Sequence, residues 1–314
     1  MRIAVIGAGG VGGVFGGLLA QAGNDVSFVA RGEHLAAIRA GGLRVHGPWG
    51  TFAVHPRAAA APADLAADAP FDVLLVAVKA GQVREVAPGL GPLVAAGTTV
   101  VPLQNGVEAA STLAGALGVG PVAGGLCHVI AWREGPGEVR TTGTPLQITV
   151  GELSGGGSAR LERFAGAVRA SGAGAVVADD VLAATWEKFL FIDPLSSVGA
   201  ATRAPLGVLR AEPRIRALLV AAAEEVAAVA RSRGVRLPPD AVARTMARYD
   251  ELPATTTASM QRDVAAGRPS ELHEQTGTVV RLGEEAGVPV PLHRLLLTVL
   301  TPQEAEARGR SASA

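Results

Sequence analysis

The chain has 314 residues, of which 48% are hydrophobic and 18% charged, an ordinary composition for a globular protein of about two domains. Its 28 basic residues balance 28 acidic ones, which argues against a nucleic-acid partner and a polybasic membrane anchor. A single cysteine, Cys127, excludes an intramolecular disulfide, and no apolar run suits a secretory signal or a membrane helix, so we expect a cytoplasmic protein.

The first half of the chain alternates strand and helix patterns. Residues 2–6 form a β-branched run, residues 10–22 have a helical pattern, and residues 25–30 return to strand-like sequence, which makes a βαβ unit. Further strands are expected at 43–46, 51–54, 72–78, 98–103, 122–130 and 146–151. This alternation predicts an α/β fold with a mostly parallel, doubly wound sheet of the Rossmann type.

Strand signals stop near residue 178, and segments rich in Ala, Leu, Val, Glu and Arg follow. A helix is expected from Pro213 to the residue before Gly234, because proline favours helix starts and glycine favours helix ends. We therefore predict a Rossmann domain at 1–178 and an all-helical domain at 179–314, whose wide apolar helix faces suit a homodimer. The other expected helices are 239–250, 254–266, 270–286 and 291–306, followed by a frayed tail at 307–314.

A glycine-rich turn joins the first strand to the first helix. Residues 7–12 read Gly-Ala-Gly-Gly-Val-Gly, which matches G-x-G-x-x-G in the strand–turn–helix context that makes this motif informative. Gly7 permits the sharp turn, Gly9 leaves room for a pyrophosphate, and Gly12 allows close packing of helix on sheet. A simple packing turn is the alternative, but the context favours dinucleotide binding by Gly7, Gly9, Gly10 and Gly12.

The residue after the second strand bears on which dinucleotide binds. An acidic residue about 20 positions after the glycine turn would hold the ribose hydroxyls of NAD. Arg31 occupies that place, and its guanidinium suits the 2′-phosphate of NADPH. Glu33 stands close by, so the strictness of the preference stays open.

Lysine and asparagine are scarce in this chain. Lys79 and Lys188 are the only lysines, and Asn105 is one of two asparagines. Lys79 and Asn105 each follow a predicted strand, where ligands bind in open α/β sheets, although a solvated cation and a turn dipeptide would also explain them. Lys188 lies in the apolar segment 186–192, where burial would favour proton donation; a lysine that reaches solvent or pairs with a carboxylate is the alternative.

Taken together, these motifs resemble the ketopantoate reductases over nearly the whole chain. The resemblance implies NADPH-dependent reduction of 2-dehydropantoate to pantoate by a Rossmann domain followed by a helical domain. The matching residues are the glycine turn, Arg31, Val78-Lys79-Ala80, Gln104-Asn105-Gly106, Trp186-Glu187-Lys188, Ser259-Met260 and Glu271.

The resemblance also implies roles for individual residues. Lys188 would bind the keto oxygen and supply the proton, Glu271 would hold the substrate hydroxyl and the lysine, and Ser259 would contact the substrate carboxylate. Lys79 and Asn105 would touch cofactor and substrate. A helix N-terminus and a surface hydroxyl would explain Glu271 and Ser259 without function.

Three positions depart from the family pattern. Members that handle ketopantoate typically have asparagines where this chain has Ile192, Ser196 and Leu206. Ser196 remains a candidate substrate contact, but lost amides alter discrimination among substrates. Another 2-oxo acid, ketone or imine is therefore an alternative substrate, and a non-enzymatic NADP(H)-sensing protein is an alternative function.

Other chemistries find little support in the sequence. The six histidines include no His-Glu-x-x-His motif and no obvious ligand pairing, so no metal site is predicted. Cys127 and His128 are adjacent on a predicted strand, where their side chains would point to opposite faces. A Cys–His nucleophile is therefore not expected.

Overall fold

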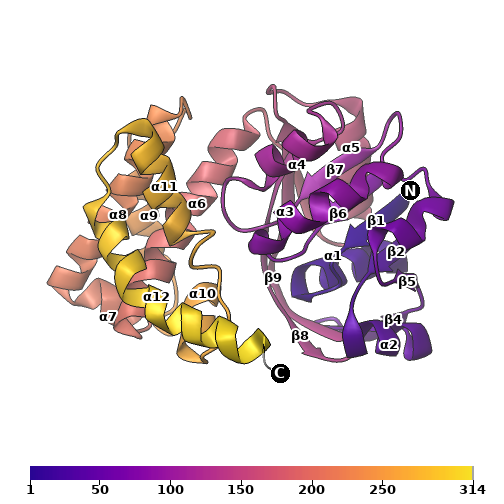
Figure 1. The fold of residues 1–314 in the computed structure, drawn as a ribbon, viewed down its shortest axis with the longest axis horizontal. Coiled ribbons are helices and arrows are strands. Elements are labelled where there is room, and N and C mark those ends of the chain that lie inside the picture. Colours follow the sequence, from indigo (N-terminus) through magenta and orange to yellow (C-terminus); the bar gives the residue numbers. More distant parts are fainter. Residues whose placement is uncertain (313–314) are drawn as a thin grey trace. The chain divides into compact units, whose positions relative to one another are not determined.

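A computed structural model describes residues 1–312, which form two compact units (Figure 1). The first unit contains residues 1–104 and 108–182, and the second contains residues 105–107 and those from 183 onward. This division differs from the expected one in two ways: the boundary lies a few residues later, and the short segment 105–107 belongs with the helices.

The first unit contains the predicted parallel sheet. Its strands follow the order β5-β2-β1-β6-β7, and all neighbours are parallel. The central strand β1 is almost fully buried because helices cover both faces of such a sheet. The strands are β1 (Arg2–Ile6), β2 (Asp25–Val29), β5 (Arg57–Ala59), β6 (Val73–Val76) and β7 (Thr99–Pro102).

The Rossmann-type parallel sheet is confirmed, and a second sheet that was not foreseen lies beside it in the same unit. The strands predicted at 43–46, 51–54, 122–130 and 146–151 exist, but they join this mixed sheet of order β10-β9-β3-β4, with β8 on β9. The short connections between β3 and β4 and between β8 and β9 explain why this sheet is mixed, because a tight turn can join only antiparallel strands. The strands are β3 (Leu43–Gly47), β4 (Gly50–Val54), β8 (Ala123–Gly135), β9 (Glu138–Glu152) and β10 (Gly174–Val177).

Helix α1 (Gly10–Gln21) packs against both sheets of this unit. A Cβ atom added at Gly16 would lie 2.6 Å from the ring of Phe28 on β2, and one at Gly17 would lie 2.5 Å from Val45 on β3. The helix is therefore glycine-rich because two sheets approach it closely. The other helices are α2 (Gly32–Gly41), α3 (Val83–Val86), α4 (Ala109–Leu117) and α5 (Ala159–Ala170), with short 3₁₀ segments at Pro62–Asp68, Ala80–Gln82 and Ala87–Leu93.

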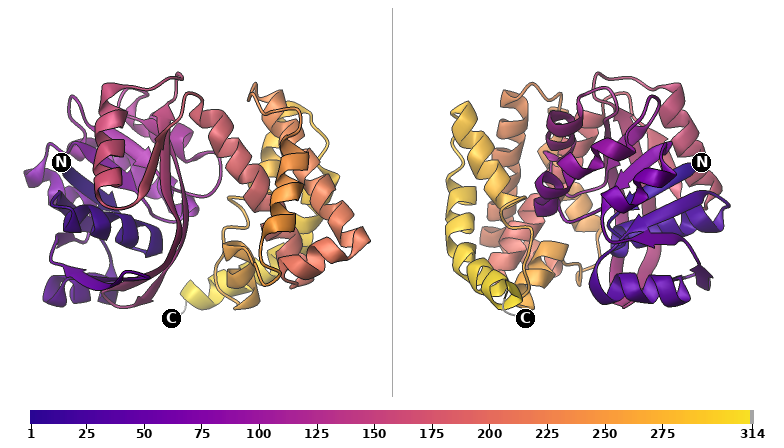
Figure 2. Two further views of the ribbon diagram at one scale, coloured as in Figure 1. Left: turned by 180° about the vertical axis from the view of Figure 1, so that it is seen from behind. Right: turned by 45° about the vertical axis from the view of Figure 1, so that its right-hand side comes forward.

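The second unit is helical, as predicted, and Figure 2 shows its helices from two further directions. Helix α8 lies in its core, with one apolar face fully buried. Among residues 1–312 no helix is long and apolar enough to cross a membrane. The helices are α6 (Val181–Thr202), α7 (Leu206–Ala211), α8 (Pro213–Ser232), α9 (Ala241–Glu251), α10 (Ser259–Ala265), α11 (Thr276–Ala286) and α12 (Pro291–Ala312).

The expected tail at 307–314 is wrong for residues 307–312, which continue α12; residues 313–314 lie outside the described part. Ala307 is buried. Glu304, also buried, accepts hydrogen bonds from the backbone N–H and hydroxyl of Ser270 and from Arg308 one turn later. These contacts hold the C-terminal turns of α12 against the segment before α11. The prediction of a frayed tail failed because it considered only the low apolar content and not these polar contacts.

Candidate functional site

The glycine turn has the geometry that the motif predicts. Gly7 has φ +105°, and a Cβ atom there would lie 2.8 Å from the backbone N of Val78. A Cβ at Gly12 would lie 2.0 Å from the carbonyl oxygen of Gly7, so larger residues are excluded at both positions. Gly9 is exposed, and nothing lies within 4 Å of its Cβ direction. The turn is thus tight on its inner side and open at Gly9.

Gly10 has a different reason to be glycine. A Cβ there would lie 2.7 Å from the backbone of Ala131 on β8, so the packing of α1 against the second sheet accounts for this position. Its expected contact with the cofactor stays a prediction.

The N-terminus of α1 fits the phosphates of a dinucleotide. Gly9 is the N-cap residue and offers no side-chain cap, and the first turn carries no acidic side chain. The first N–H groups of the helix, together with its partial positive charge, therefore face the open space beside Gly9. A nicotinamide dinucleotide is compatible with this arrangement.

Arg31 and Lys79 lie at the same edge of the parallel sheet as the glycine turn. Arg31 follows β2 at the N-cap position of α2, and Lys79 stands shortly after β6. Since β2 and β6 are the parallel neighbours of β1, the structure brings these candidates to the carboxyl ends of three adjacent strands. The Arg31 guanidinium is 3.5 Å from the Glu85 carboxylate, and both side chains are about two-thirds exposed. Such a pair is weakly held.

Lys188 and Asn105 meet in the second unit. Lys188 is half-buried on α6, and its Nζ donates a hydrogen bond of 2.9 Å to Oδ1 of Asn105. Asn105 is held there because Val107 packs into the helical core and Gly106 passes close to the backbone of Glu274; a Cβ at Gly106 would lie 3.2 Å from that carbonyl oxygen. Two residues 83 positions apart, both chosen from sequence, are therefore in contact.

Glu271 lies in the turn before α11 and has a partner that the sequence analysis missed. The amide of Gln275, a fully buried residue, donates to Oε2 of Glu271 at 3.2 Å. The spacing of four residues between Glu271 and Gln275 could have indicated this contact, because side chains four apart on a helical turn are neighbours. Oε1 of Gln275 has no hydrogen-bond partner among the described residues. Ser259 begins α10 and is exposed, so its hydroxyl is accessible.

The three positions that depart from the family pattern differ in burial. Ile192 on α6 is half-buried, whereas Ser196 and Leu206 are fully buried. Leu206 packs with the apolar side chains of α7, α8 and α9. The Ser196 hydroxyl has no hydrogen-bond partner in the described part of the chain, and its contact with substrate stays a prediction.

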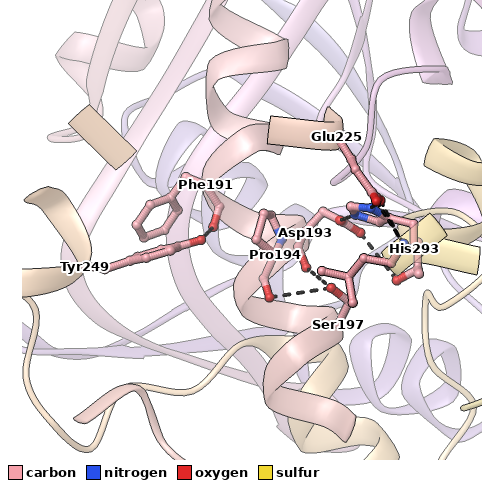
Figure 3. Close-up of polar contacts among 9 residues, drawn as sticks. Phe191, Asp193, Pro194, Ser197, Glu225, Tyr249 and His293 are labelled. Atoms are coloured by element: carbon pink, nitrogen blue, oxygen red, sulfur yellow. Dashed lines mark hydrogen bonds and ion pairs between the residues drawn. The ribbon is translucent and has the colours of Figure 1, made fainter. Parts of the chain in front are cut away.

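A buried charged triad on three helices was also missed (Figure 3). His293 on α12 is fully buried; its Nε2 and Nδ1 each lie 2.6 Å from a carboxylate oxygen, of Asp193 on α6 and Glu225 on α8. Burial by itself would lower the pKa of His293, but the two carboxylates raise it to about 9. His293 is therefore an imidazolium, and no spacing in the sequence brings the three residues together.

Glu225 has a second role at the start of α12. Its carboxylate accepts the backbone N–H groups of Leu292 and His293 at 2.8 and 3.0 Å. Burial acts to raise the pKa of Glu225, but its hydrogen bonds with His293 and these backbone groups lower it overall. The same figure shows the Tyr249 hydroxyl donating to the Phe191 carbonyl at 2.5 Å, which ties α9 to α6.

One histidine in the first unit has neighbours of the metal-binding type. Ligand atoms of His46, Glu134 and Glu138 lie within 4.8 Å of one another. Each carboxylate already has a counter-ion, since Arg140 binds Glu134 at 2.7 Å and Arg44 binds Glu138 at 3.1 Å. The group is thus an arginine-neutralised network, and we assign no metal to it.

Comparison with known proteins identifies the family. Residues 3–155 match the family described as ketopantoate reductase PanE/ApbA, and residues 180–304 match its C-terminal family. A 2-dehydropantoate 2-reductase of Halobacterium salinarum is 31% identical over 297 residues, which are 94% of this chain and 96% of that protein.

Solved structures agree with this assignment. A PanE/ApbA family ketopantoate reductase from Ralstonia eutropha JMP134 is 32% identical, with a TM-score of 0.88 over 98% of this chain and 100% of that one. A ternary structure of D-mandelate dehydrogenase with NADH and anilino(oxo)acetate has the same fold, with a TM-score of 0.88 at 22% identity over 98% and 99% of the two chains. The resemblance inferred from sequence is confirmed: the chain belongs to the ketopantoate reductase family and is an oxidoreductase that acts on a CH–OH group.

Proposed function

We propose that this protein reduces 2-dehydropantoate to pantoate with NADPH. Family membership supports the substrate class, and the open, uncapped glycine turn supports a nicotinamide dinucleotide. Arg31 at the end of β2 supports NADPH over NADH, because a guanidinium pairs with a 2′-phosphate.

Lys188 is the proton donor in this proposal. NADPH, when bound, supplies a hydride to the keto carbon, and the carbonyl oxygen then takes up negative charge. The Lys188 ammonium stabilises that charge and transfers one proton, which completes the alcohol. Asn105 accepts one of the three ammonium N–H groups at 2.9 Å and so restricts the directions of the other two.

Glu271 and Ser259 bind the substrate in this account. Glu271, held by the buried Gln275 amide, accepts a substrate hydroxyl, and the exposed Ser259 hydroxyl donates to the carboxylate. Lys79 contacts cofactor at the edge of the parallel sheet. Ser196 is retained as a further substrate contact.

The Lys188–Asn105 hydrogen bond is the observation that carries the proposal. It brings one of the two lysines of the chain into contact with one of its two asparagines. Steady-state oxidation of NADPH across 2-dehydropantoate and related 2-oxo acids tests it, with NADH as the second cofactor. We expect 2-dehydropantoate to give the highest kcat/KM and NADPH to be preferred. Absence of turnover with every 2-oxo acid would contradict the reaction itself.

A second candidate is the reduction of a more apolar 2-oxo acid, ketone or imine. Ile192 favours it, because a half-buried apolar side chain stands where a family amide would hydrogen-bond the substrate. The D-mandelate dehydrogenase of the same fold illustrates that the fold alone does not fix the substrate. The substrate panel decides between the two, and any turnover removes the non-enzymatic NADP(H) sensor.

A cytoplasmic homodimer joined through the helical unit completes the proposal. The homodimer was expected from wide apolar helix faces, but the apolar face of α8 is buried in the unit's own core. Val208, Leu218, Leu295 and Val299 of this unit stay exposed, and Leu295 and Val299 lie one turn apart on α12. Sedimentation analysis of wild type and Leu295→Glu tests this assembly.

A further inference from the structure

His34 links three segments of the first unit that are distant in sequence. It stands in the first turn of α2 and is only 5% exposed. Its Nε2 lies 2.7 Å from the carbonyl oxygen of Ala8 in the glycine turn, and its Nδ1 lies 2.9 Å from the backbone N of Gly137, between β8 and β9. The first contact spans 26 residues and the second 103.

The two contacts fix the protonation state of the ring. A backbone N–H can only donate, so Nδ1 must accept from Gly137. Nε2 then carries the proton and donates it to the Ala8 carbonyl, which can only accept. Both ring nitrogens are satisfied by the neutral tautomer with hydrogen on Nε2 and by no other form.

The direction of the Ala8 carbonyl determines the direction of the next N–H group. In a planar trans peptide the C=O of Ala8 and the N–H of Gly9 point in opposite directions. Because the His34 ring binds the carbonyl, the Gly9 N–H faces the side of the turn away from His34. That is the side on which the uncapped N-terminus of α1 would receive phosphate.

We propose that His34 is a positioning residue for the dinucleotide: it holds the Ala8–Gly9 peptide so that the Gly9 N–H points at the pyrophosphate. This inference rests on the proposed function, because it needs a nicotinamide dinucleotide at the glycine turn. His34 touches neither cofactor nor substrate and acts through the backbone. Its loss weakens cofactor binding and leaves the proton-transfer step at Lys188 unchanged.

The proposal gives cofactor binding a pH dependence. Burial lowers the pKa of His34 from 6.5; Arg133 on β8 acts in the same direction, and the carbonyls of Ala8 and Gly135 oppose it. A protonated ring would present Nδ1–H to the Gly137 N–H, so that contact would be lost. The His34 contribution is therefore complete above pH 6.5 and declines as the pH falls through the lowered pKa.

Dissociation constants for NADP⁺, measured on the full chain from about pH 7.5 down to the lowest pH at which wild type stays folded, test this role. His34→Phe keeps a ring of similar size but removes both hydrogen bonds, and we expect Kd to rise about tenfold at the higher pH. His34→Gln retains a donor and an acceptor without titrating, so it should restore most of the affinity. His55→Gln, an exposed histidine on the same unit, is the matched control.

The pH comparison separates positioning from a merely structural role. Titration of the 2′-phosphate is common to all variants, so the additional loss of affinity at low pH should occur in wild type and His55→Gln and be absent in His34→Gln. At saturating NADPH, kcat should be within about twofold of wild type in His34→Gln and in His34→Phe if that variant folds. Equal Kd values, or equal pH profiles for wild type and His34→Gln, would overturn the proposal. Failure of wild type to bind NADP⁺ would instead refute the proposed function.

Discussion

The two units each bury a histidine; one histidine is neutral and the other is positively charged. His34 in the Rossmann unit bonds two backbone groups, and burial lowers its pKa. His293 in the helical unit lies between two carboxylates, which overcome burial and raise its pKa to about 9. Both side chains are at most 5% exposed, but only His293 has carboxylate partners that outweigh the cost of burying its charge. The buried histidine of the Rossmann unit bonds backbone groups, whereas that of the helical unit bonds charged side chains.

The largest effect on stability should come from removing the charge of His293. His293→Leu leaves the buried Asp193 and the part-buried Glu225 without their counter-ion, and breaking a buried ion group in this way costs about 3–5 kcal/mol. Urea unfolding measures the loss, with His273→Leu as the exposed control on the same unit. A loss below about 1 kcal/mol would mean that the triad is not charged as described.

Alkaline pH should weaken the same triad without mutation. Because the folded pKa of His293 is raised from 6.5 to about 9, its contribution is complete below pH 6.5 and is lost as the pH rises through about 9. The shift corresponds to about 3 kcal/mol. The free energy of unfolding should fall between neutral pH and about pH 10 more steeply in wild type than in His293→Gln. Parallel pH profiles would contradict the imidazolium.

Cofactor preference should respond to one exposed side chain of the Rossmann unit. Arg31→Glu replaces the partner of a 2′-phosphate with a partner for ribose hydroxyls. The ratio of kcat/KM for NADPH to that for NADH should fall by about 10- to 100-fold, which corresponds to about 1.4–2.8 kcal/mol. Arg39→Glu is the control, since Arg39 lies later on α2 and donates a hydrogen bond to the carbonyl oxygen of Ala58 on β5. An unchanged ratio would remove Arg31 from the cofactor site.

The smallest effect should come from the ion partner of Arg31. The Arg31–Glu85 pair is exposed and 3.5 Å long, so Glu85→Gln should change stability by less than about 1 kcal/mol. NADP⁺ affinity should rise slightly, by about twofold, because the Arg31 guanidinium no longer has to give up a carboxylate partner when it binds the 2′-phosphate. Calorimetric titration with NADP⁺ measures it, and a marked loss of affinity would show that Glu85 positions Arg31.

Local patterns predicted the parallel sheet, the glycine turn and the helical second half, because each depends on periodicity or on residues adjacent in the chain. The second sheet was missed as a separate layer, since strand patterns at 43–46 and 122–130 do not specify their partners. Asn105 and Lys188 were chosen from scarcity and resemblance, but their contact needed the fold. The His34 and His293 networks join residues far apart in sequence, and no local pattern predicts such contacts.

The central claim is that Lys188 supplies the proton while the Rossmann unit binds the cofactor independently. The direct measurement is NADPH oxidation with 2-dehydropantoate by wild type and Lys188→Met, together with NADP⁺ dissociation constants for both. Glu187→Gln on the same helix, whose carboxylate is 3.8 Å from Arg244, is the control. We predict a fall in kcat of about 10²- to 10⁴-fold in Lys188→Met with NADP⁺ affinity unchanged. Near-normal turnover in Lys188→Met would contradict the account.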